Sequence, residues 1–291
     1  MNTSEHKMPG WARVLLLILP WGFTILTFQL LAILVAGIDL ASFVGAETSS
    51  QQLIIAIFTL GGTFLLLWLF MKFVDKEPFI ELGFHTGTRT LDFFAGVSIT
   101  LAMVLLGFFL LVYFEEISFS IAVFDPIELT ISVFLFATVA IAEEMLFRGY
   151  ILKNLMISFN KYLALIVSAL VFSFVHAPNP NASILSLFSL FLSGIALGLY
   201  YLYTKNLWFP IGAHLGWNLF QTLLGFNVSG IDAYSLIEIA TDENTCWNGG
   251  AFGFEGSYLS VAAELLLIFG IYFYRHKLKP KTEYRSQSSE Q

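Results

Sequence analysis

The chain has 291 residues, of which 57% are hydrophobic and only 12% charged, and its formal net charge at pH 7 is −7. A mean hydropathy of +0.78 excludes an ordinary soluble globular domain and indicates a membrane protein. The negative charge lies mainly in loops, and no basic surface suited to nucleic acid is evident, so we expect no nucleic-acid partner.

Apolar runs long enough to cross a hydrocarbon layer about 30 Å thick, which takes roughly 20 helical residues, occur at eight places. The predicted spans lie near residues 12–37, 52–74, 92–114, 127–157, 162–176, 183–204, 207–226 and 258–274. The first run lacks a small-residue cleavage site and is too long for a signal peptide, so we expect it to be retained. The sequence predicts an all-α, polytopic transmembrane helical bundle that forms a single integral-membrane domain over residues 1–291.

Basic residues predict the orientation of this bundle in the membrane, because lysine and arginine collect at cytoplasmic helix ends during insertion. With eight spans and a cytoplasmic N-terminus, all 14 basic residues fall on the cytoplasmic side. The opposite loops contain many acidic residues and no lysine or arginine. We therefore predict that both termini are cytoplasmic. The multi-pass layout, with no recognisable organelle signal, suggests a bacterial plasma membrane.

Two segments have the composition of soluble chain. One is the outer loop from about 227 to 257, which contains the lone Cys246 and therefore has no partner for an internal disulfide. The other is the polar tail at 276–291, which is predicted to be disordered.

Few ionisable or strongly polar side chains lie inside the predicted spans. Placing a charge in the bilayer interior costs roughly 2.5 to 3.5 kcal/mol, so each such residue is expected to have a partner or a function. The candidates are Glu143, Glu144, Arg148, His176, His214, Asn218 and Glu264. Because Glu264 lies close to the outer end of its span, we expect it to face the membrane interface.

Spacing along the chain relates several of these residues. Glu143 and His176 lie at nearly equal distances from the turn at 158–161, so antiparallel helices bring both to one depth, roughly 25 Å from that turn. Glu144 and Arg148 are four residues apart and can form an ion pair on one helix face. Glu143 points about 100° away from that pair.

The next predicted hairpin, which turns near residues 205–206, contributes a second polar pair. His214 and Asn218 are four residues apart and share one helix face. They reach the depth of Glu143 and His176 only if the turn at 158–161 protrudes from the membrane by one or two helical turns. After His176, the sequence APNPN cannot continue a helix, so the imidazole is expected to end one.

Three short motifs in this region resemble those of a known protease family. EEMLFR resembles the EExxxR motif, FSFVH the FxxxH motif and HLGWN the HxxxN motif of the CAAX-protease and bacteriocin-processing family, also called CPBP or Abi. The family comprises multi-pass intramembrane proteases, including type II CAAX prenyl endopeptidases and proteins like lysostaphin resistance protein A. The motifs occur in the family's order within residues 143–218, and we place the catalytic core at about 127–226.

The resemblance implies peptide-bond hydrolysis within the membrane and assigns a role to each motif residue. Glu143 would activate a water molecule together with His176, while His214 and Asn218 would stabilise the oxyanion. Glu144 and Arg148 would orient this group. The implied substrate is a peptide or membrane protein, and in a bacterial membrane peptide maturation, self-immunity or membrane-protein cleavage is expected rather than CAAX processing.

The sequence leaves other interpretations open. Glu143, His176 and His214 can supply three ligands to a catalytic zinc, although no HExxH helix is present, and the family has been described both as metalloproteases and as glutamate-dependent proteases. Glu144 and Arg148 can be a purely structural ion pair, and Phe172 is expected to be a packing residue. A proton-coupled transporter or a non-catalytic membrane scaffold would also contain buried Glu and His residues.

Overall fold

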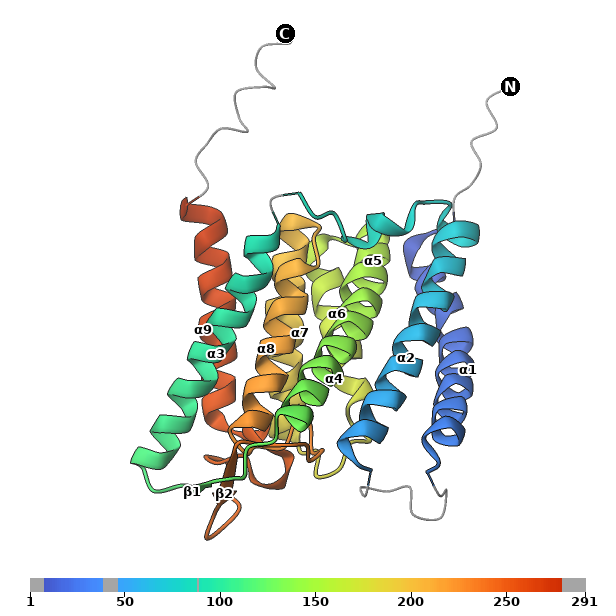
Figure 1. Ribbon diagram of the computed structural model, residues 1–291. Helices are drawn as coiled ribbons and strands as arrows, with labels where there is room; N and C mark the ends of the chain where they lie inside the picture. The colour runs from blue at the N-terminus through green and yellow to red at the C-terminus, as the bar shows by residue number, and fades with distance from the viewer. Residues whose placement is uncertain (1–7, 39–46, 88, 279–291) are drawn as a thin grey trace, which may run out of the picture.

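The protein folds as a bundle of helices that run between two common faces (Figure 1). The computed structural model describes residues 8–38, 47–87 and 89–278. The α-helices are α1 (Gly10–Ala36), α2 (Ser49–Phe70), α3 (Thr90–Tyr113), α4 (Pro126–Glu144), α5 (Lys153–Ser158), α6 (Lys161–Val175), α7 (Ile184–Thr204), α8 (Trp208–Leu223) and α9 (Tyr258–Phe273). Every predicted apolar stretch is helical, and the predicted fold class is confirmed as mainly helical.

Six helices in the described residues are long and apolar enough to cross a membrane by length and composition, when α2, α4 and α9 are counted together with the helical segments that continue them. The other two predicted spans form the shorter helices α6, with 15 residues, and α8, with 16. Pro178 and Pro180 follow the end of α6 and explain its early termination, because proline lacks the backbone N–H that a continuing helix requires. The structure thus establishes a multi-pass membrane protein, whereas eight complete spans stay a prediction.

Among the residues that the structure describes, three segments of π-helix extend or join the α-helices. They are η1 (Met71–Asp75) after α2, η3 (Met145–Leu152) between α4 and α5, and η6 (Tyr274–Leu278) after α9. In η3 all eight residues are buried, and the segment begins directly after Glu144. The predicted helix at 127–157 is therefore continuous, but its hydrogen-bond pattern changes beside the polar cluster, as π segments often do at functional sites.

Close packing between α3 and α8 fixes the position of the helix that carries His214. Gly96 on α3 lies against the backbone of Phe209 and Ala213, and Gly212 on α8 lies against the backbone of Phe93. A side chain at either glycine would collide with main-chain atoms, so the absence of Cβ allows the two helices to approach closely.

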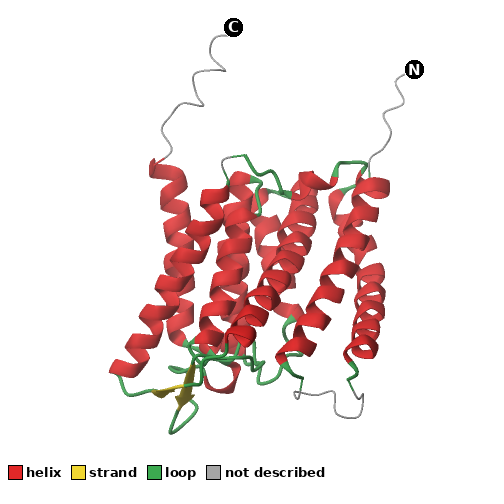
Figure 2. Cartoon of the chain, viewed as in Figure 1, coloured by secondary structure: helices red, strands yellow, loops and turns green. Residues whose placement is uncertain are grey.

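The loops at the end of the bundle opposite the start of α1 contain the sheet structure in the described residues (Figure 2). Strands β1 (Ser118–Ile121) and β2 (Ile237–Ala240) pair antiparallel, with Ser118 opposite Ala240. Two short 3-10 helices, η4 (Gly250–Phe252) and η5 (Phe254–Gly256), follow β2, and a further one, η2 (Phe79–Leu82), lies before α3. The description of 227–257 as a soluble loop is wrong for residues 252–257, because these are buried and Phe252 and Phe254 join hydrophobic clusters of the bundle.

The first described helix begins, and the last one ends, at the same end of the bundle (Figure 1). This agrees with termini on one side of the membrane, although which side is cytoplasmic stays a prediction. The predicted disordered tail begins too early, because residues 274–278 are helical in η6. Its remaining part, 279–291, lies outside the described residues.

Candidate active site

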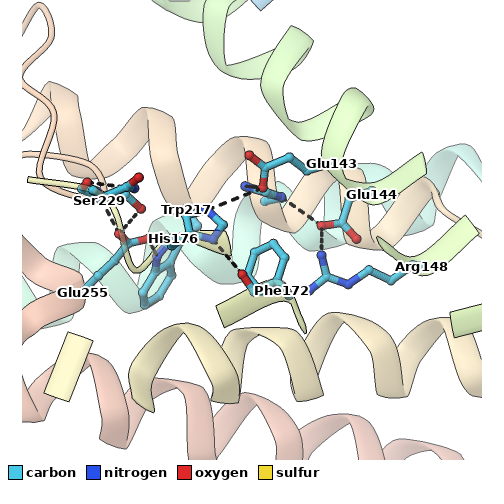
Figure 3. A network of polar contacts seen from close by, with 10 residues as sticks. Glu143, Glu144, Arg148, Phe172, His176, Trp217, Ser229 and Glu255 are labelled. Carbon is cyan, nitrogen blue, oxygen red and sulfur yellow. Dashed lines mark hydrogen bonds and ion pairs between the residues drawn. The ribbon is translucent and has the colours of Figure 1, made fainter. Parts of the chain in front are cut away.

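Side chains from α4, the end of α6 and α8 converge on the carboxylate of Glu143 (Figure 3). Glu143 Oε2 lies 3.9 Å from His176 Nε2 and 3.9 Å from His214 Nε2. This oxygen is buried and has no hydrogen-bond partner. The structure therefore places Glu143 and His176 at one depth, as helix counting predicts, and brings His214 to the same depth.

The two imidazole rings are each oriented by a bond to their other nitrogen. His176 Nδ1 donates to the carbonyl oxygen of Phe172 at 2.8 Å, because a carbonyl can only accept. His214 Nδ1 lies 2.9 Å from Glu144 Oε1, a carboxylate oxygen that also accepts from Arg148. In the neutral form of each ring, the proton is then on Nδ1 and the Nε2 lone pair faces Glu143.

Glu144 and Arg148 form the predicted ion pair, with Arg148 Nη1 2.6 Å from Glu144 Oε1 and both side chains almost fully buried. Glu144 also binds His214, a contact that the sequence did not predict. The guanidinium carbon of Arg148 lies 4.3 Å from the centre of the Phe172 ring, which also packs against His176. Phe172 is a packing residue as expected, but it packs against the site itself.

The cluster borders a cavity of about 540 Å³ whose wall is mainly apolar. Glu143, His176, His214 and Asn218 all contribute to its lining. Asn218 lies one helical turn beyond His214 on α8 and is buried, so its carboxamide faces the same space as the imidazoles. All six sequence-predicted site residues are thus brought into one cluster.

The three candidate zinc ligands match a metal site in chemistry but not in spacing. Ligand atoms of a tetrahedral zinc, each about 2.0 to 2.1 Å from the ion, lie roughly 3.3 Å apart. The carboxylate oxygen of Glu143 is 3.9 Å from each imidazole Nε2, which is wider. Within residues 8–38, 47–87 and 89–278, no group of three or more His, Cys, Asp or Glu side chains is arranged to hold a metal ion.

The outer loop contributes cavity residues that the sequence analysis missed. Glu255, in η5, accepts hydrogen bonds from Trp217 Nε1 at 3.1 Å and from the backbone N–H and hydroxyl of Ser229 at 2.9 and 2.8 Å (Figure 3). Both Glu255 and Ser229 line the cavity. The composition of this loop gave no signal for them, because their burial depends on the loop folding back onto the bundle.

Glu264 on α9 contradicts the expectation that it faces the membrane interface. Its side chain is 2% exposed, lines the same cavity and accepts a hydrogen bond from Ser193 of α7 at 2.5 Å. The sequence did contain one indication of this position. An ionisable side chain inside a span has a high free-energy cost in contact with lipid, which favours a position in a protein cavity. The closeness of Glu264 to the end of its helix therefore did not predict where its side chain lies.

Comparison with known families identifies the region that contains this cluster. Residues 125–220, about a third of the chain, match the model of the family described as type II CAAX prenyl endopeptidase Rce1-like. The chain carries an Rce1-like region. The resemblance inferred from the three motifs is thereby confirmed, and the family is one of proteases. A search of curated proteins found no matching relative.

The Rce1-like region runs from the first residues of α4 into α8 and contains Glu143, Glu144, Arg148, His176, His214 and Asn218. Asp125 caps α4 by accepting from the backbone N–H of Ile127, so the matched region begins at the start of this helix. Helices α1 to α3, the outer loop and α9 lie outside it. Glu255 and Glu264 are therefore features of this chain beyond the family match.

Proposed function

We propose that this protein is an intramembrane endopeptidase that hydrolyses a peptide bond by a glutamate-activated water molecule. The observation that carries the proposal is the position of a buried, unpartnered Glu143 oxygen between two oriented imidazoles. The match to a protease family supports the reaction class.

The spacing around Glu143 suits one bridging water. A separation of 3.9 Å is too long for a direct hydrogen bond, which spans about 2.7 to 3.2 Å, but accommodates a single water between the two groups. In the proposed reaction, Glu143 takes a proton from this water and the oxygen attacks the carbonyl carbon. His176 Nε2, as a neutral acceptor, holds the second proton of the water and directs the oxygen.

His214 and Asn218 are proposed to stabilise the oxyanion that forms. The carboxylate of Glu144, bonded to His214 Nδ1, stabilises a positive charge on this ring, so that Nε2 can carry a proton and donate it in a hydrogen bond. The Asn218 carboxamide supplies a second donor in the same cavity. The C–N bond then breaks, and the proton held by Glu143 passes to the leaving amine.

The proposed substrate is a peptide or membrane protein that reaches the cavity within the bilayer of a bacterial plasma membrane. The residues 127–226 are proposed as the catalytic core. Because the zinc spacing is not met, no metal takes part in the proposed steps.

The test uses the full-length protein, purified and reconstituted in liposomes, with a pool of single-span peptides analysed by mass spectrometry. Glu143→Gln keeps the size of the side chain but removes the base, so cleavage is expected to fall at least about 100-fold. Glu238→Gln, at an exposed position of β2, is the matched control and is expected to cleave like the wild type.

Three outcomes would contradict the proposal. Undiminished cleavage by Glu143→Gln would exclude this residue as the base. Loss of cleavage on chelation, with recovery on adding zinc and a stoichiometric metal by elemental analysis, would overturn the metal-independent mechanism. A protein that cleaves no peptide, but whose cellular phenotype survives both Glu143→Gln and His176→Ala, would be a scaffold rather than a protease.

A further inference from the structure

Acidic side chains outnumber basic ones around the cavity in the part of the chain that the structure describes. Glu47, Glu143, Glu255 and Glu264 line it, and no described lining residue is a lysine or arginine. The nearby Arg148 is already paired with Glu144, so it does not offset the four lining carboxylates. A field of one sign in a cleft with apolar walls attracts a ligand group of the opposite charge.

Glu264 is a buried carboxylate of the cavity wall with one bonded and one unbonded oxygen. Its Oε1 accepts from the Ser193 hydroxyl, whereas its Oε2 is buried and has no hydrogen-bond partner. Glu255 differs, because both of its oxygens accept hydrogen bonds from Trp217 or Ser229. A buried, unpartnered carboxylate oxygen is unfavourable in the free protein and can be satisfied by a ligand that brings a donor.

The position of Glu264 is fixed by polar contacts between two helices. Ser189 and Ser193 on α7 face Ser260 and Glu264 on α9, with Ser189 Oγ and Ser260 Oγ 2.6 Å apart. The two pairs are one helical turn apart on both helices, so they hold the carboxylate in a defined orientation at the cavity wall. Glu264 is thus placed to recognise a ligand group, although it lies outside the Rce1-like region.

We propose that Glu264 forms a subsite for a basic side chain of the substrate, lysine in preference to arginine, close to the bond that is cleaved. With one free oxygen, Glu264 suits the single-point charge of an ammonium group better than the two-pronged guanidinium. The negative charges of Glu143 and Glu255 in the same cavity favour the same ligand. This specificity proposal rests on the proposed peptidase function.

The first test measures cleavage by the full-length protein in liposomes. Single-span peptides carrying lysine at successive positions are compared with otherwise identical peptides carrying norleucine, which has a similar length and no charge. For the wild type, kcat/KM is expected to be at least about tenfold higher for lysine at one or two positions. Glu264→Gln is expected to bring this ratio close to one, whereas the exposed Glu238→Gln leaves it unchanged.

The second test does not depend on activity and separates the two proposals. Binding of the same fluorescently labelled peptides is measured by anisotropy with Glu143→Gln protein, and then with Glu143→Gln, Glu264→Gln protein. A preference for lysine of about tenfold that is lost in the double variant supports the subsite even if the wild type cleaves nothing. Glu264→Asp retains the charge and is expected to retain the preference.

Three results would contradict the proposed subsite. If the Glu143→Gln protein binds the lysine and norleucine peptides equally well, the subsite is excluded. This measurement needs no substitution at Glu264, so the result stands even if Glu264→Gln does not fold. An unchanged ratio in a folded Glu264→Gln protein would assign the preference to another group. Cleavage without lysine preference would contradict the subsite and leave the peptidase proposal intact.

Discussion

At the residue scale, two adjacent carboxylates have different partners. Glu144 is completely buried and bonded to Arg148 and His214, whereas Glu143 is partly exposed to the cavity and faces the imidazole Nε2 atoms. Neighbouring helical residues point about 100° apart, so one helix turn serves both environments. This division allows one carboxylate to hold the cluster together while the other stays available to a water molecule.

The buried ion pair predicts a large loss of stability when one partner is removed. Arg148→Met leaves the charge of Glu144 without its cation, and we expect the free energy of unfolding to fall by about 3 to 5 kcal/mol. Lys153→Met is the matched control. Its pair with Glu77 is partly exposed, and its loss is expected to cost at most about 1 kcal/mol.

The measurement is reversible chemical unfolding in detergent micelles, followed by tryptophan fluorescence. The double variant Glu144→Gln, Arg148→Met is expected to be more stable than Arg148→Met alone, because no unpaired charge stays buried. Equal losses for Arg148→Met and Lys153→Met would contradict the structural importance of the buried pair.

At the element scale, the site depends on how closely α8 approaches α3. Phe93 and Gly212 meet through backbone atoms, two residues before His214 on α8. A shift of α8 would move His214 and Asn218 together, since both belong to this helix. The two residues proposed to stabilise the oxyanion, His214 and Asn218, are therefore positioned by the contact that Gly212 makes on another face of α8.

This contact predicts that Gly212→Ala damages both stability and activity. An added Cβ would overlap the carbonyl of Phe93, so the helices must separate, at a cost of about 1 to 3 kcal/mol. Gly270→Ala on α9 is the matched control, because a Cβ added at Gly270 would meet no other atom within 4 Å. It is expected to leave stability unchanged or raise it by up to about 1 kcal/mol.

Unfolding midpoints and peptide cleavage rates of the two variants give the comparison. The expectation is that Gly212→Ala lowers both quantities. A Gly212→Ala protein with wild-type stability and rate would show that α3 and α8 tolerate separation and that their close contact does not position the site.

At the scale of the whole molecule, the distribution of charge defines two different faces. The basic helix ends lie towards the described chain ends, and the acidic loops lie with β1 and β2 at the opposite end (Figure 1). Arg13 and Arg148 are not free loop charges of the kind that mark the cytoplasmic side, because both are buried in ion pairs, with Asp75 and Glu144 respectively. The remaining loop charges still favour cytoplasmic termini.

The single cysteine provides a direct test of this orientation. Cys246 is exposed in the outer loop, so a membrane-impermeant maleimide is expected to label it in intact cells that produce the protein. In a Cys246→Ser background, Lys161→Cys at the opposite end is expected to react only after the membrane is permeabilised. The reverse pattern of labelling would show that the bundle is inserted in the opposite orientation.

The sequence by itself determined the features that depend on neighbours along the chain. Long apolar runs specify helices in a membrane because every backbone polar group must be satisfied internally. Spacing by four residues fixed the pairs Glu144 with Arg148 and His214 with Asn218, and equal distance from one tight turn matched Glu143 with His176. Each of these relations follows from helix geometry alone.

Only the tertiary structure decided which helix faces meet. The contact between Glu144 and His214, the position of Glu264 in the cavity and the burial of Glu255 all join segments distant in sequence. No periodicity encodes them, because they depend on how side chains of separate helices and a returning loop pack together. A membrane helix that is apolar on all sides gives little indication of the face it presents to its neighbours, so packing places its few polar residues.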